Sequence, residues 1–219
     1  YEPALTHLSV PYVKTEWHRY AADLNRVPQD IDASSVEGNS NRAGLHARGF
    51  HWVWTTTKIP LMQKPMSEKQ HQELVQLIYE PFHQSVRDLC ENMKSKGYSQ
   101  VFHLDLHSMP SRGTSEHRDP GEIRADIVVS DCEGRSARPD FVDLVITSYA
   151  RAGFKVGYNW PYMGGRVTEV YGKPEAHHHT VQVELNRSLY MNEESKALIP
   201  EKAEKLKPRL EKALQLISE

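Results

Sequence analysis

The segment VFHLDLHSMPS, residues 101–111, alternates apolar and polar side chains as a strand with one buried face does. Successive side chains of a strand point to opposite faces, so His103, Asp105 and His107 share one face. Metal-bound imidazoles usually donate their other N–H to a carboxylate or carbonyl. We interpret His107 as a metal ligand, Asp105 as its orienting partner or a ligand itself, and His103 as structural. Core histidines held by hydrogen bonds are the competing interpretation, and three polar residues at alternate positions favour a site.

A second segment, TVQVELN at residues 180–186, alternates strictly and places Glu184 on its polar face. A carboxylate on an interior strand is costly to bury unless it is paired or used. Beside an activated water molecule, it can act first as a general base and then as a general acid. The competing interpretation is a half-exposed strand with a solvated polar face, and the strand alone does not separate the two.

Substrate contacts are predicted in the segment ADLNR, where Asn25 and Arg26 follow Asp23. The planar guanidinium of Arg26 suits a bidentate contact with a substrate carboxylate. A loop ion pair between Asp23 and Arg26 is the competing interpretation. Arg112 is a further candidate for a carboxylate contact.

The segment NWPYMGGRVTEVYG, which begins at Asn159, combines Pro and Gly with side chains that can bind a substrate. Its mixed chemistry indicates a loop over a site, although an ordinary turn would also fit. The residues that we expect to contact substrate there are Asn159, Tyr162, Arg166 and Thr168.

The elements that would position these residues form an alternating series of strands and helices. A helix is predicted from the N-cap Ser67 to Gly97, with Gln70 completing a capping box and Pro81 breaking or kinking it. Further helices are predicted at 138–154 and 200–218, and strands at 100–107, 124–131, 155–159 and 180–186. This pattern predicts an α/β fold whose working residues lie at the carboxyl ends of strands.

Composition excludes several classes of partner. The chain has 219 residues, enough for one domain over 1–219, and 27 Lys and Arg nearly balance 29 Asp and Glu. Nucleic acid or membrane held by bulk electrostatics is therefore not expected, and a small molecule is the expected partner. Two cysteines and the lack of a visible secretory signal favour a cytoplasmic location. The sequence carries no signal for the oligomeric state.

Taken together, five segments between residues 10 and 195 resemble the N-formylglutamate amidohydrolase family, which is related to zinc carboxypeptidases and aspartoacylases. The segments are DLNR, DLHSMPS, ADIVVSDCEGRSA, GFKVGYNWPYMGG and VQVELNRSLYM. The resemblance implies a three-layer α/β/α fold around a mixed sheet, of the phosphorylase/hydrolase type. It also implies Zn²⁺-dependent cleavage of N-formyl-L-glutamate to formate and glutamate, in the context of histidine degradation.

Carried over by motif, the resemblance implies that His107 binds zinc and that Glu184 is catalytic. Arg26 resembles an arginine that contacts a substrate carboxylate or an oxyanion. Asn159, Tyr162 and Thr168 match the substrate-side loop of the family.

The sequence departs from the family at its start. The family has another zinc-binding histidine in a PHSG-like motif, followed by an acidic ligand, and neither is present here. We therefore expect the remaining zinc ligands upstream of Tyr1. Two alternatives stay open: a zinc hydrolase for another N-acyl amino acid or small peptide, and a non-catalytic ligand-binding relative with an incomplete metal site.

Overall fold

The computed structural model describes residues 1–219, which form two compact units. The first, here called the sheet unit, combines Tyr1–Tyr12 with Ser99–Glu219. The second, here called the helical unit, is Val13–Tyr98. The prediction that these residues form a single catalytic domain stays a prediction.

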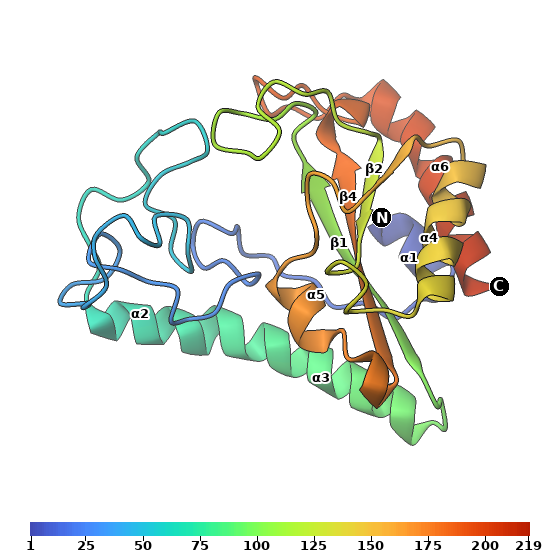
Figure 1. The fold of residues 1–219 in the computed structure, drawn as a ribbon, viewed down its shortest axis with the longest axis horizontal. Coiled ribbons are helices and arrows are strands. Elements are labelled where there is room, and N and C mark those ends of the chain that lie inside the picture. Colours follow the sequence, from blue (N-terminus) through green and yellow to red (C-terminus); the bar gives the residue numbers. More distant parts are fainter. The chain divides into compact units, whose positions relative to one another are not determined.

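The helical unit starts with a long irregular segment and ends in a helical segment (Figure 1). This segment consists of α2 (Glu68–Leu74), a π-helical stretch (Val75–Tyr79) and α3 (Glu80–Ser95). The predicted capping box is confirmed, because Gln70 N–H donates to Ser67 Oγ at 3.3 Å and Ser67 N–H donates to Gln70 Oε1 at 3.0 Å.

Pro81 does not end this helical segment. It lies in the first turn of α3, where its missing N–H is tolerated, and the wider π-helical stretch comes just before it. The predicted disturbance is therefore a local change of helix type. Gly97 follows the last turn with φ +92°, in the left-handed region that closes helices.

The sheet unit contains a four-stranded mixed sheet of order β1-β4-β2-β3. The strands are β1 (Val101–Met109), β2 (Ile127–Ser130), β3 (Val156–Tyr158) and β4 (His178–Asn186). Pairing is parallel between β1 and β4 and between β2 and β3, and antiparallel between β2 and β4. The carboxyl ends of β1 and β4 therefore lie side by side, and that of β4 adjoins the start of β2.

Helices cover both faces of this sheet, which confirms the predicted α/β/α layers (Figure 1). One face carries α1 (Glu2–His7), α4 (Pro139–Arg151) and α6 (Pro200–Ser218), and the other carries the short α5 (Arg166–Tyr171). The sequence predicts a loop where α5 forms, and this prediction is wrong for Arg166–Tyr171. Two short 3-10 helices, Pro174–Ala176 and Arg187–Leu189, flank β4. None of the helices combines the length and apolar composition required to span a bilayer.

Apolar packing fixes which face of the sheet carries the polar residues. Val181 and Val183 of β4 pack with Val145 and Tyr149 of α4 and with Leu210 of α6. Burying each such side chain contributes roughly 1.5–3 kcal/mol, so a one-residue slip of β4 would be strongly unfavourable. The alternate residues of β4 must therefore face the layer that contains α5.

Candidate active site on the polar face of the sheet

The register of β1 and β4 brings the predicted chemical residues side by side. Asp105 pairs with Gln182, and His107 pairs with Glu184. Parallel strands in register place paired residues on the same face, so the two predicted segments form one polar surface. His107 and Glu184 lie in the last third of their strands, near the carboxyl ends where working residues are predicted.

Asp105 and His107 form an ion pair whose Oδ1–Nε2 distance is 2.9 Å. The hydroxyl of Thr168 on α5 donates to the other oxygen of Asp105 at 3.1 Å. Burial alone would raise the pKa of Asp105, but the attraction and hydrogen bond of His107, with help from His103 and Thr168, lower it. The predicted orienting role of Asp105 is consistent with this distance and stays a prediction.

Glu184 is a buried carboxylate on a strand whose nine residues are all buried. The amide Nε2 of Gln182 donates to its Oε1 at 3.0 Å. On the other side Glu184 pairs with Val128 of β2. The solvated polar face considered for this strand is therefore wrong, because a neighbouring strand lies on each side and α5 packs against β4.

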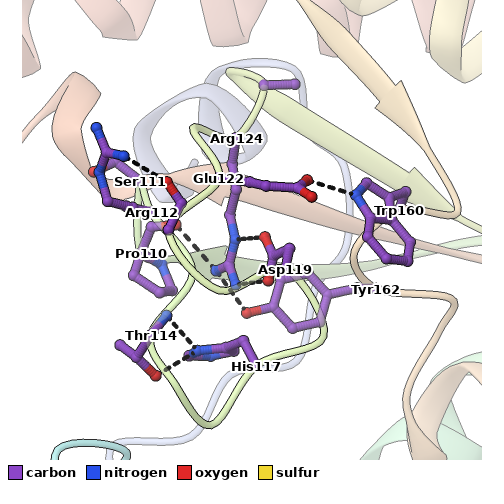
Figure 2. Close-up of polar contacts among 12 residues, drawn as sticks. Pro110, Ser111, Arg112, Thr114, His117, Asp119, Glu122, Arg124, Trp160 and Tyr162 are labelled. Atoms are coloured by element: carbon purple, nitrogen blue, oxygen red, sulfur yellow. Dashed lines mark hydrogen bonds and ion pairs between the residues drawn. The ribbon is translucent and has the colours of Figure 1, made fainter.

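The loop of residues 110–124 follows β1 and is organised around Arg124 (Figure 2). Its guanidinium donates to both carboxylate oxygens of Asp119, at 2.7 and 2.8 Å, and to the carbonyl of Pro110 at 3.1 Å. It also donates to the Tyr162 hydroxyl at 2.9 Å. Burial raises the pKa of Tyr162, Arg124 opposes this change and the charge of Glu184 adds to it. The electrostatic influence of Glu184 thus reaches Tyr162.

A glycine allows this loop to close tightly. A Cβ atom on Gly113 would lie 1.9 Å from the carbonyl oxygen of Asp119, so no larger residue fits without a backbone shift. His117 adds to the same loop by accepting from the Thr114 N–H at 3.0 Å (Figure 2).

The other predicted substrate contacts on the sheet unit already have partners within the protein. Asn159 Nδ2 donates to Asp131 at 2.9 Å, and Arg166 Nη1 donates to Glu169 at 3.0 Å. Arg112 donates to the carbonyl of Gly121. Thr168 is fully buried, which suits its bond to Asp105.

Asn25 and Arg26 belong to the helical unit. Arg26 Nη1 donates to the Asn25 carbonyl at 2.8 Å, and its Nε donates to the carbonyl of Arg48 at 3.3 Å. Asp23 accepts from Arg19 at 2.7 Å and from the indole of Trp52 at 2.9 Å. The ion pair of Asp23 therefore forms with Arg19, and the considered Asp23–Arg26 pair is not the observed one.

The helical unit also contains a buried pair of histidines. His51 Nε2 lies 2.9 Å from His71 Nδ1, and the two residues are 1% and 3% exposed. Burial and the neighbouring His71 lower the pKa of His51 to about 4. His51 is therefore neutral in the folded protein at neutral pH.

This pKa predicts a loss of stability in mild acid. Because the unfolded chain binds a proton near pH 6.5 and folded His51 only near pH 4, the unfolded state binds more protons between these values. The contribution of His51 to the free energy of unfolding is fully present above pH 6.5, and about 2 kcal/mol of it is lost between pH 6.5 and 4.5.

Urea unfolding at pH 6.5 and at pH 4.5 should show that loss in the wild type and a smaller loss in His51→Gln. An exposed His18→Gln control should keep the wild-type loss; an equal loss in His51→Gln would contradict the assignment.

The zinc ion implied by the resemblance would need several donor side chains close together. Among residues 1–219, no group of three or more His, Cys, Asp or Glu side chains could hold a metal ion. A catalytic zinc usually takes three protein ligands, and His107 with its partner Asp105 supplies one imidazole. These donors do not fit a zinc ion by themselves, so zinc dependence stays a prediction.

Three residues of this surface were missed from the sequence: Gln182, Asp119 and Arg124. The position of Gln182, two residues before Glu184 on the same strand face, was a usable signal. Asp119 and Arg124 lie in a segment with many charges, and no spacing in the sequence shows that this pair is 1% exposed.

Comparisons with known proteins found relatives with one shared description. The chain is 26% identical over 193 residues to the N-formylglutamate deformylase of Pseudomonas putida, covering 85% of this chain and 66% of that protein. The deformylase of Pseudomonas aeruginosa is 26% identical over 192 residues, covering 86% and 67%. The chain thus spans about two thirds of the length of these relatives.

Solved structures show the same fold. The structure is similar to N-formylglutamate amidohydrolase from Ralstonia eutropha JMP134, with a TM-score of 0.77 and 25% identity over 90% of this chain and 71% of that one. A gene product from Agrobacterium tumefaciens shares the fold, with a TM-score of 0.55 and 21% identity over 92% and 69% of the two chains. The family model of N-formylglutamate amidohydrolase matches residues 1–191. Because this match spans most of its residues, the chain belongs to the N-formylglutamate amidohydrolase family.

Proposed function

We propose that this protein hydrolyses the formyl amide of N-formyl-L-glutamate and releases formate and glutamate. The observation that carries the proposal is the buried carboxylate of Glu184 beside His107, in a chain that belongs to an amidohydrolase family. The bond from Gln182 and the pair of His107 with Asp105 support a built site over a chance cluster.

In the proposed reaction, Glu184 takes a proton from a water molecule. The oxygen of that water forms a bond to the formyl carbon, and the carbonyl becomes a tetrahedral oxyanion. The C–N bond then breaks as Glu184 returns the proton to the leaving nitrogen. The products are formate and the free amine of glutamate, so one water molecule is consumed and no redox partner is required.

Recognition of the substrate requires cations, because the glutamate part carries two carboxylates. Arg26 is the first candidate, as proposed from the sequence, with Arg112 and Arg166 as further candidates. Arginine suits this role because its planar fork binds a carboxylate bidentately. Arg166 is partly exposed and paired only by a surface ion pair, which is weak enough for a substrate carboxylate to compete.

The experiment that tests the function is a panel of substrates assayed with the purified protein, with and without added Zn²⁺. We expect formate release from N-formyl-L-glutamate to exceed cleavage of N-acetyl-L-glutamate and of a dipeptide. Faster cleavage of one of the other amides would replace the substrate assignment while keeping amide hydrolysis. Binding without turnover in every condition would contradict the enzyme and favour a non-catalytic ligand-binding relative. The zinc arm separately tests the predicted metal dependence.

Two further expectations from the sequence remain predictions of this proposal. They are a cytoplasmic location and a place in histidine degradation. A small-molecule partner is consistent with the deformylases among its relatives.

A further inference from the structure

Gln182 occupies the centre of the polar face and contacts the proposed base directly. It lies on β4, paired with Asp105 of β1 on one side and with Ser130 of β2 on the other. The residue is 3% exposed, and its Nε2 donates to Glu184 Oε1 at 3.0 Å. Such burial leaves the side chain little room to change its conformation.

The orientation of the Gln182 amide follows from this bond. A flipped amide would bring its oxygen against the carboxylate oxygen of Glu184, which is unfavourable, so the N–H side must face Glu184. The opposite atom, Oε1, is then buried without a hydrogen-bond partner among residues 1–219. An unsatisfied buried acceptor costs free energy, and an apolar residue of similar size would avoid that cost. The fold alone gives no reason for glutamine at this position.

We propose that Gln182 is a positioning residue that holds the carboxylate of Glu184 in its working orientation, an inference that rests on the proposed function. One oxygen of Glu184 accepts the amide N–H, and the carboxylate plane is thereby fixed. The other oxygen, Oε2, then has a defined direction for taking the proton from water. Orientation of a base matters because small misplacements of reacting groups lower rates steeply.

The test compares Gln182→Met with Gln182→Glu. Methionine has a similar volume and no N–H donor, while glutamate keeps the shape and places a second carboxylate against Glu184. We expect kcat for N-formyl-L-glutamate to fall at least about ten-fold in Gln182→Met and further in Gln182→Glu, with KM within about two-fold. The urea midpoint of Gln182→Met should fall only moderately, because methionine removes the unsatisfied oxygen together with the donor to Glu184.

A matched control is Gln100→Met. Gln100 immediately precedes β1, whose first residue Val101 pairs with His178 at the opposite end of β4 from Glu184. Its Oε1 accepts from His179 at 3.1 Å and from Arg138 at 3.1 Å. The control should keep kcat within about two-fold of the wild type whatever it does to stability.

Two outcomes would overturn the proposal. One is a kcat of Gln182→Met within about two-fold of the wild type, and the other is a raised KM with kcat retained. A wild type that releases no formate would contradict the proposed function, but the role of Gln182 can still be tested by crystal structures of the wild type and Gln182→Met. The Glu184 carboxylate should be rotated in Gln182→Met relative to the wild type, and an unchanged carboxylate would refute the positioning role.

Discussion

Replacing Glu184 by glutamine is expected to lower kcat for N-formyl-L-glutamate by between about 10²- and 10⁴-fold, the usual contribution of a general base. Glutamine keeps the size of the side chain and its place beside Gln182. It cannot accept a proton from water, nor return one to the leaving nitrogen. Because the same atoms carry both transfers, no second group of the chain is expected to replace them.

The measurement is formate release under saturating substrate, together with substrate affinity by calorimetry. Affinity should remain within about three-fold, since the change removes a group that acts mainly in the transition state. Glu211→Gln is the matched control, because Glu211 lies on α6 and pairs only with the exposed His7. Near-normal turnover in Glu184→Gln would refute the assigned base.

Replacing Asp119 by alanine is expected to destabilise the sheet unit by about 3–5 kcal/mol, the range measured when one partner of a buried ion pair is removed. Both side chains of the Asp119–Arg124 pair are 1% exposed. The variant leaves the guanidinium of Arg124 buried without its carboxylate. Arg124 also holds Pro110 and Tyr162, so the loop of residues 110–124 should loosen with it.

Urea unfolding at neutral pH measures this effect, and two variants sharpen it. Asp140→Ala removes the partner of an exposed pair with Arg138 and should change stability little, because solvent screens that pair. The double variant Asp119→Leu/Arg124→Met should recover part of the loss, since it leaves no unpaired charge. A single variant Asp119→Ala as stable as the wild type would show that the pair does not hold the loop.

Much of the fold followed from local patterns. Three elements formed as predicted from patterns that involve residues only a few positions apart. They are the helix after the capping box of Ser67 and Gln70, the strand with alternation at residues 101–107 and the helix with an apolar stripe at residues 200–218. Pro208 lies inside α6 without ending it, because packing of Leu206 and Leu210 in the core outweighs the lost hydrogen bond. Element ends were less well predicted, as the shortening of the second strand to Ile127–Ser130 shows.

The sequence by itself determined that His107 and Glu184 lie on polar faces of two strands, because strand alternation is a local property. Only the tertiary structure decided that these strands are neighbours in register, that Gln182 donates to Glu184, and that Thr168 donates to Asp105. The same holds for the pair of Asp119 and Arg124. Strand order and the burial of charges depend on contacts between residues distant in the chain, and no periodicity in a single sequence encodes those contacts.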